Sequence, residues 1–214
     1  MSLVSIALGL TALLLVVALI WRGFSTRASL PCPSWLAWLV ELDNPLLRNN
    51  SARTIVSHLA LEPGMKVLDM GCGPGRLTIP VAKAVGESGE ITAFDMQEAM
   101  LQRVQARAKT EHLENIRFVH GKAGDTMPGR NKFRNKFDRV LLVTVLGEIP
   151  EQQEALAGIF ESLKPGGLLS VTEVIADPHF QPRGKVRRLA ASAGFAEQAF
   201  FGSAISYTLN FTRP

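Results

Sequence analysis

The residues with the clearest chemical potential form the stretch Val67-Leu68-Asp69-Met70-Gly71-Cys72-Gly73-Pro74-Gly75. Three glycines at alternate positions follow an apolar run, so the backbone can approach a ligand closely and can adopt positive φ. Asp95, twenty residues after the last glycine, ends the run Glu90–Asp95. A carboxylate at the end of a strand can accept two hydrogen bonds from the vicinal hydroxyls of a ribose. The pattern predicts a site for an adenosyl ligand.

The spacing of Asp69 discriminates between adenosyl ligands. The dinucleotide fingerprint is G-x-G-x-x-G, whereas this loop reads Asp-x-Gly-x-Gly-x-Gly. A carboxylate at position 69 is unfavourable beside a pyrophosphate but favourable beside an ammonium or sulfonium. This favours S-adenosylmethionine over NAD. The alternative is that the glycines only form a tight turn and that Asp95 only caps the helix that follows.

Alternating helices and strands must position these residues. The apolar periodicity predicts helices over residues 53–61, 77–85, 98–110, 152–163 and 185–193, and strands over 66–70, 91–94, 116–119, 139–145, 168–173, 195–201 and 205–211. Such alternation implies an α/β fold with a parallel sheet and helices on both faces. Ligands then bind at the carboxyl ends of the strands.

The chain is similar to the class I S-adenosylmethionine-dependent methyltransferase family. The similarity extends over residues 45–214 and is carried by the Val67–Gly75 loop, Asp95, the fourth strand Phe137–Val143 and the run Leu163–Gly167. It implies a methyltransferase domain over residues 51–214. The implied fold is a Rossmann-like, doubly wound and mostly parallel seven-stranded sheet that ends in a C-terminal antiparallel hairpin.

The same resemblance implies the cofactor contacts. Those expected to bind S-adenosylmethionine are Asp69, Gly71, Gly73, Gly75, Asp95, Met96, Ala123, Thr144 and Leu146. Asp95 is expected on the ribose, Met96 beside the adenine, and the backbone of Ala123 at the adenine edge. Related sequences often carry an acid where Lys122 stands here, a departure that Asp125 could compensate.

Candidate acid–base residues follow the fourth and fifth strands. Glu148 lies where the family places residues near the methyl group, and is a candidate general base. Asp177 and His179 follow the fifth strand and are candidates to orient or deprotonate a substrate. The alternatives are that Glu148 is an N-cap or surface residue beside Pro150, and that His179 is merely exposed.

The N-terminal segment predicts a membrane anchor. Ser2–Trp21 contains no charged residue, and at ~1.5 Å per residue twenty residues match the ~30 Å core of a bilayer. We expect one transmembrane helix over residues 1–22, although a cleaved signal peptide or a buried helix would also be apolar. Arg22 and Arg27 follow it, which predicts a cytoplasmic catalytic domain. The chain has only two cysteines, Cys32 and Cys72, which fits a reducing compartment.

Residues 23–50 are expected to form a linker and a short helix. Trp35 and Trp38 share one face of that helix, which would lie on the bilayer or cover the domain as a lid. The tandem repeat of Arg-Asn-Lys-Phe over residues 130–137 adds four positive charges. It is either a contact for an anionic lipid or substrate, or a solvated loop.

The methyl acceptor is constrained mainly by sequence motifs that the chain lacks. No Asn-Pro-Pro-Tyr or Asp-Pro-Pro-Tyr stretch follows the fourth strand, which argues against methylation of base amines, and the net charge of +4 is scattered, so nucleic acid is not expected. No metal site is predicted. A membrane tether makes most sense for a lipid-like or other hydrophobic small-molecule acceptor. A membrane-tethered S-adenosylmethionine-binding protein without catalysis and an NAD-dependent oxidoreductase are the alternatives, and the oligomeric state is left open.

Overall fold

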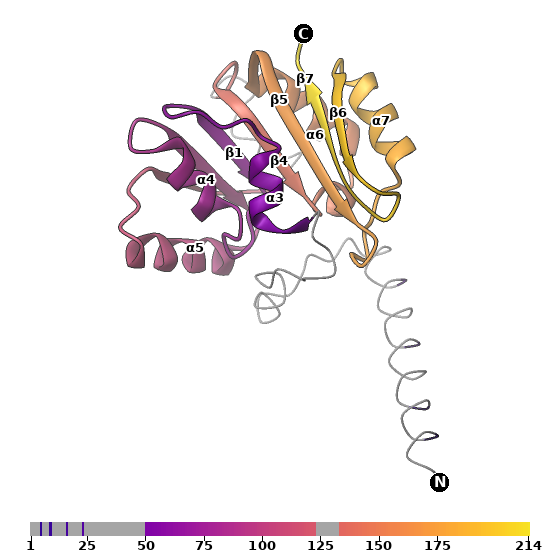
Figure 1. The fold of residues 1–214 in the computed structure, drawn as a ribbon, viewed down its shortest axis with the longest axis horizontal. Coiled ribbons are helices and arrows are strands. Elements are labelled where there is room, and N and C mark those ends of the chain that lie inside the picture. Colours follow the sequence, from indigo (N-terminus) through magenta and orange to yellow (C-terminus); the bar gives the residue numbers. More distant parts are fainter. Residues whose placement is uncertain (1–4, 6–8, 10–15, 17–22, 24–49, 123–132) are drawn as a thin grey trace.

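One seven-stranded sheet organises the protein. The computed structural model describes residues 5, 9, 16, 23, 50–122 and 133–214. The strand order is β3-β2-β1-β4-β5-β7-β6 (Figure 1). The strands are β1 (Lys66–Met70), β2 (Glu90–Asp95), β3 (Ile116–His120), β4 (Phe137–Val143), β5 (Leu163–Val174), β6 (Ala196–Gly202) and β7 (Ser206–Thr212).

The strand pairing confirms the predicted mixed sheet. Strands β1 to β5 pair in parallel, whereas β7 runs antiparallel to both β5 and β6. The order reverses between β1 and β4. In a doubly wound sheet, this reversal opens a crevice at the carboxyl ends of the two strands, and ligands bind there.

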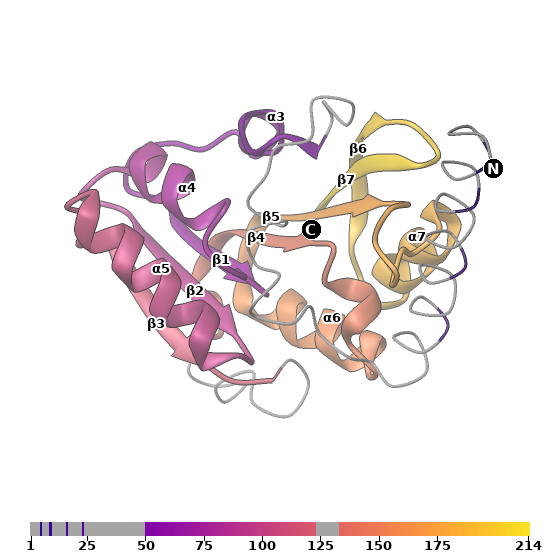
Figure 2. The same cartoon turned by 90° about the horizontal axis from the view of Figure 1, so that it is seen from below.

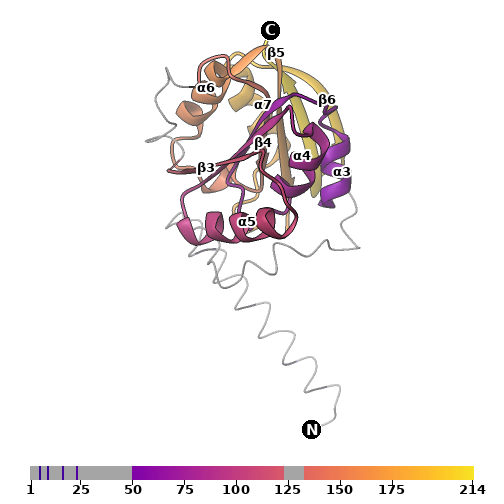
Figure 3. The ribbon, with the colours of Figure 1, turned by 90° about the vertical axis from the view of Figure 1, so that its left-hand side faces the viewer.

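Helices cover both faces of the sheet. They are α3 (Ala52–Ser57), α4 (Thr78–Val85), α5 (Glu98–Thr110), the 3₁₀ helix η3 (Leu146–Glu148), α6 (Gln152–Ser162) and α7 (Arg183–Ser192). Apolar residues of α3, α4 and α5 belong to one core cluster, and those of α6 and α7 to a second. In Figure 3 the strands accordingly lie between α6 on one side and α3 and α4 on the other, and Figure 2 shows the same layers from below.

Local sequence accounts for most of these elements. In α5 the buried residues Met100, Leu101, Val104 and Ala108 recur at helical spacing. Pro80 is the third residue of α4, where its missing N–H breaks no intrahelical bond. The parallel strand β1 is buried from Val67 to Met70, as expected for a strand covered on both faces.

Among the predicted boundaries that differ from the structure, three differ because of backbone geometry. Helix α3 ends at Ser57 rather than 61, ahead of Ala60 with φ of 44°. Strand β4 ends at Val143 rather than 145, because Thr144 has φ of 55°. Strand β5 begins at Leu163 rather than 168, and its pairing with β4 shifts register between Phe137 and Arg139. The run Leu163–Gly167, which was expected to precede the fifth strand, therefore forms the irregular start of that strand.

Several predictions concern residues outside the described ranges. They are the transmembrane helix over 1–22, apart from its isolated described positions, the helix with Trp35 and Trp38, Cys32, Ala123 and Asp125. Within the ranges that are described, no helix is both long and apolar enough to cross a bilayer.

Candidate functional site

The glycine loop turns from the end of β1 onto the end of β2. The backbone N–H groups of Gly71 and Cys72 both donate to the carbonyl oxygen of Phe94, at 2.8 and 3.0 Å. Gly71, Gly73 and Gly75 have φ of 71°, 52° and 88°. Residues with a Cβ rarely adopt this left-handed backbone conformation. The path of the loop therefore requires glycine at all three positions.

The first two glycines have different surroundings. A Cβ at Gly71 would lie 2.4 Å from Cγ2 of Val145, so this glycine lets the loop pack against the residue that precedes η3. A Cβ at Gly73 would have no atom within 4 Å. The space beside the α-carbon of Gly73 is therefore open, whereas Gly71 is needed for close packing between the segments that follow β1 and β4.

Asp95 ties the glycine loop to the start of α5. Its Oδ2 accepts a hydrogen bond from the N–H of Gly73 at 2.9 Å, and its Oδ1 accepts one from the N–H of Gln97 at 2.8 Å. The side chain is buried, and burial raises its pKa. Gln97 is the N-cap residue of α5, so Asp95 holds the turn before the helix and does not itself occupy the capping position. Each carboxylate oxygen has two lone pairs, so Asp95 retains acceptors for a ribose diol.

A second buried carboxyl group lies beside the same loop. Oδ2 of Asp69 accepts a hydrogen bond of 2.6 Å from the hydroxyl of Thr78, at the start of α4. The pKa of Asp69 is raised to about 6. Burial is the main cause, and the negative charge of Asp95 acts in the same direction. Two acids in one desolvated site favour a ligand that carries positive charge.

The adenine side of the predicted site is partly described. Met96 is 44% exposed although it directly follows a buried strand. Its carbonyl oxygen is hydrogen-bonded to Nε2 of His120 at 2.9 Å. An exposed thioether beside Asp95 is suited to packing on a flat aromatic ring.

Thr144 and Leu146 begin the connection after β4. The N–H of Thr144 donates a hydrogen bond to the carbonyl oxygen of Thr172 at 2.9 Å. The hydroxyl of Thr144 donates to the carbonyl oxygen of Val143 at 2.8 Å. A β-branched residue at positive φ is strained, and such strain concentrates at functional sites. The side chain of Leu146 is buried in the core, while its carbonyl accepts a hydrogen bond from Gln152. The cofactor contacts of both residues stay predictions.

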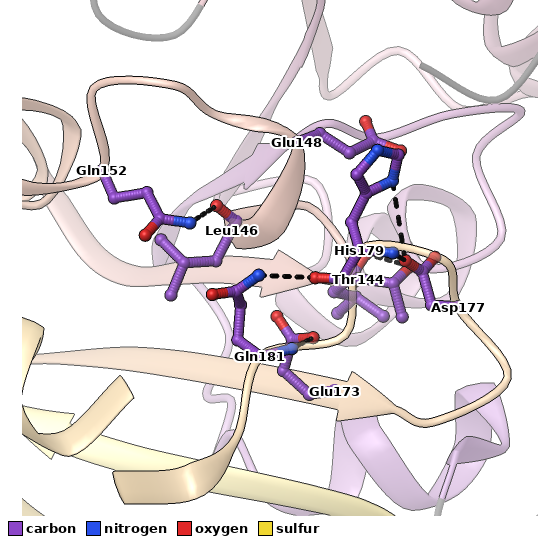
Figure 4. A network of polar contacts seen from close by, with 9 residues as sticks. Thr144, Leu146, Glu148, Gln152, Glu173, Asp177, His179 and Gln181 are labelled. Atoms are coloured by element: carbon purple, nitrogen blue, oxygen red, sulfur yellow. Dashed lines mark hydrogen bonds and ion pairs between the residues drawn. The ribbon is translucent and has the colours of Figure 1, made fainter. Parts of the chain in front are cut away.

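The three predicted acid–base residues lie together. Nδ1 of His179 is 3.9 Å from Oε1 of Glu148 and 3.9 Å from Oδ1 of Asp177 (Figure 4). The side chain of His179 is 5% exposed, so the alternative of an exposed histidine is wrong. Glu148 lies in η3 rather than at the N-cap of α6, which is Glu151. The three predicted residues, which come from two segments that follow different strands, are thus brought to one place by the fold.

Close backbone packing joins the two segments that carry these residues. A Cβ at Gly147 would lie 1.9 Å from the carbonyl oxygen of His179, so η3 contacts the loop after β5 directly. Within that loop, Oδ1 of Asp177 accepts a hydrogen bond from the N–H of His179 at 2.7 Å. Val145, the residue that would meet a Cβ at Gly71, lies three residues before Glu148 in the chain, so the cluster is close in sequence to the contact of the glycine loop with the segment after β4.

Glu173 is a residue of the site for which the sequence predicted no role. It is 1% exposed, and its Oε2 accepts a hydrogen bond from the N–H of Gln181 at 3.0 Å. Burial is the main cause that raises its pKa to about 8. In the sequence, the signal that could have identified Glu173 is an acidic residue within the apolar run of β5. An acid there is expected to be buried, and buried carboxyl groups with raised pKa values concentrate at functional sites.

Comparisons with known proteins agree with this geometry. Residues 61–198 match the family model described as "Methyltransferase domain". Demethylmenaquinone methyltransferase of Staphylococcus aureus is 36% identical over 121 residues, which are 56% of this chain and 48% of that protein. The chain thus aligns with about half the length of the curated relatives that it matches.

Solved structures show the same fold. A SAM-dependent methyltransferase from Aquifex aeolicus superposes with a TM-score of 0.75 at 18% identity, over 86% of this chain and 100% of that one. A Haemonchus contortus N-methyltransferase, solved with phosphomonomethylethanolamine and S-adenosylhomocysteine, has a TM-score of 0.63 at 14% identity, over 77% of this chain and 52% of that one.

Proposed function

This chain belongs to the class I S-adenosylmethionine-dependent methyltransferase family through its methyltransferase domain, and from that premise we propose that it methylates a hydrophobic, lipid-like acceptor at a membrane surface. The observation that carries the proposal is the position of His179, buried between Glu148 and Asp177 at the carboxyl edge of the sheet. This edge also carries the glycine loop.

The residues around the glycine loop fit S-adenosylmethionine. The open side of Gly73 leaves room for the ligand, Asp95 has acceptors for the ribose, and Asp69 can pair with the ammonium group. When bound, S-adenosylmethionine supplies an activated methyl group on a sulfonium.

The protein's own contribution is positioning and proton transfer. His179 is the group that would accept a proton from the acceptor's nucleophile, at Nε2, because Nδ1 is the nitrogen near Glu148 and Asp177. Glu148 and Asp177, 3.9 Å from Nδ1, would stabilise the resulting imidazolium. A water-poor site strengthens these charge interactions. Acceptors with an acidic O–H, N–H or activated C–H fit this arrangement best.

The hydrophobic acceptor is supported by two independent observations. The matched Staphylococcus aureus relative is named for a quinone, demethylmenaquinone. Residues 2–21 of this chain carry no charge, and an anchored enzyme meets bilayer-dissolved substrates at a high effective concentration. We therefore propose a single-pass anchor with the catalytic domain on the cytoplasmic side, where the positive flank at Arg22 and Arg27 would hold it.

Labelled-methyl transfer with the full chain in lipid vesicles tests the function. With S-adenosylmethionine and a bacterial membrane lipid extract, we expect label in the organic phase. His179→Asn should reduce kcat by about 100-fold or more, since general acid–base catalysis contributes about 10²–10⁴. His112→Asn is the matched control, because His112 has φ of 54°, which asparagine tolerates. Label confined to water-soluble products would refute the lipid-like acceptor, and cofactor binding without any turnover would favour the non-catalytic alternative.

Cofactor binding should depend on the protonation of Asp69. The pKa of Asp69 in the free protein is about 6, and a cationic ligand favours the carboxylate. Above about pH 6 the site is already ionised and affinity should be constant, while below it affinity should fall about tenfold per pH unit. The ligand's α-amino group, with an ordinary pKa of about 7.7–8.0, stays charged over pH 5–7. Titration calorimetry at pH 5, 6 and 7 measures this. Asp69→Asn should bind weakly with no such pH dependence, and equal wild-type affinity at all three values would contradict the assignment.

A further inference from the structure

We propose that Glu173, acting through Gln181, is a positioning residue that holds His179 between Glu148 and Asp177. The role of His179 rests on the proposed function, but the structural link from Glu173 to His179 does not. The inference begins from a buried acid at the end of β5 that has no part in the cofactor site.

The first link joins the two ends of the loop that carries His179. Glu173 lies just before this loop, and Gln181 just after it. The hydrogen bond of 3.0 Å from the N–H of Gln181 to Oε2 of Glu173 closes the loop at its base. Both side chains are buried, so no water competes for this contact, and its loss would leave a buried N–H without a partner.

The second link runs from Gln181 to His179. Nε2 of Gln181 donates to the carbonyl oxygen of His179 at 2.7 Å (Figure 4). The hydroxyl of Tyr207 donates to the carbonyl of Gln181 at 2.5 Å, and Tyr207 lies opposite Glu173 in the pairing of β5 with β7. Gln181 is therefore held from two strands while it fixes the backbone of His179, and Gly147 packs against both, since a Cβ there would lie 1.9 Å from the carbonyl oxygen of His179 and 2.7 Å from Nε2 of Gln181.

The third observation concerns the protonation state of Glu173. Its Oε1 is buried and has no hydrogen-bond partner, and the same holds for Oε1 of Gln181. The charges of Asp177 and Glu148 oppose ionisation of Glu173, while Lys185 favours it. Because burial dominates and raises the pKa to about 8, Glu173 is mostly neutral at pH 7. A neutral carboxyl group can be held here without adding a third negative charge beside His179.

Imidazole NMR of the full-length protein without substrate tests the link. The chain has four histidines, and the spectrum of His179→Asn identifies the signal of His179. Glu173→Gln keeps an acceptor for Gln181 and supplies an N–H donor in place of the acid O–H. Glu173→Leu removes both, and Gln181→Met removes only the side-chain donor to His179. Thr208→Val is the matched control, because Thr208 also loses a buried hydrogen bond, of 2.8 Å to Thr172, in the same pair of strands.

We expect Glu173→Leu and Gln181→Met to change the imidazole chemical shifts of His179 at a fixed pH and to lower kcat by about tenfold or more through misplacement of the imidazole. Glu173→Gln and Thr208→Val should leave the imidazole signals of His179 in place. Wild-type kcat should fall as pH rises through about 8, where Glu173 ionises, and Glu173→Gln should lack this fall. Should Glu173→Leu fail to fold, Gln181→Met supplies the same comparison.

Unchanged imidazole signals of His179 in Gln181→Met, or in a folded Glu173→Leu, would overturn the proposal, as would Glu173→Gln behaving like Glu173→Leu. If no variant or wild-type protein transfers a methyl group, the proposed function fails. The NMR result still decides the positioning link, so the two failures are distinguishable.

Discussion

Gly147→Ala should lower kcat for methyl transfer by about 100-fold, because a displacement of about 1 Å in a catalytic site can cost that much. The new Cβ would lie 1.9 Å from the carbonyl oxygen and 2.8 Å from the carbonyl carbon of His179. Both contacts are with backbone, so no side-chain rotation relieves them. The loop after β5 must move away from η3, which separates His179 from Glu148. Steady-state kinetics beside titration calorimetry should show the loss in kcat with cofactor affinity unchanged.

Gly184→Ala is the matched control for this substitution. Its Cβ would lie 3.6 Å from Nη1 of Arg188, an ordinary contact with the end of a flexible side chain. It lies in α7, where alanine also favours the helix. We expect normal activity. Wild-type kcat in a folded Gly147→Ala protein would show that the contact between η3 and His179 does not serve catalysis.

Asp95→Ala should weaken binding of S-adenosylmethionine by at least about 100-fold. Two hydrogen bonds from a ribose diol to a charged acceptor contribute about 1.5–3 kcal/mol each, and about 2.8 kcal/mol corresponds to 100-fold in affinity. The substitution also removes the acceptor that holds the N–H of Gly73 at 2.9 Å. The glycine loop would thus lose part of its preorganisation together with the ligand contact. Calorimetric titration with S-adenosylmethionine and S-adenosylhomocysteine measures the change.

Asp138→Ala provides a matched loss of a carboxylate away from the site. Asp138 accepts one hydrogen bond from the backbone N–H of Lys66 at 2.8 Å and one from Lys164 at 2.6 Å. It therefore resembles Asp95 in holding a backbone donor, but it lies at the opposite end of the parallel strands. We expect lower stability with normal cofactor affinity. If both variants bind the cofactor like wild type, Asp95 is only a structural cap.

The two substitutions probe separate halves of one crevice. Asp95 holds the loop after β1 from the end of β2, and Gly147 follows β4 and contacts the loop after β5. Val145 packs on Gly71 and connects these halves. The expected separation of effects, affinity in one case and kcat in the other, follows because only the second half carries the acid–base residues.

Cofactor recognition was largely predictable from the sequence because it depends on short stretches of chain. The glycine loop, Asp95 and the apolar runs that form β1 and β2 are each read within a few residues, since strand and helix periods are local properties. The ends of α3 and β4 were mispredicted because Ala60 and Thr144 have positive φ, which neither residue type indicates. Ala123 and the N-terminal helix lie outside the described residues, so their roles remain predictions.

The amino-acid sequence by itself determined the fold class, the cofactor loop and the identity of the candidate acid–base residues. Only the tertiary structure decided how these residues act together. It buries His179 within 3.9 Å of two carboxylates, raises the pKa values of Asp69 and Glu173, and makes Gly147 a contact of His179. The physical reason is that proximity, desolvation and close backbone packing arise between segments that are far apart in the chain. Glycine loops and apolar periodicity, by contrast, depend only on residues that are close in sequence.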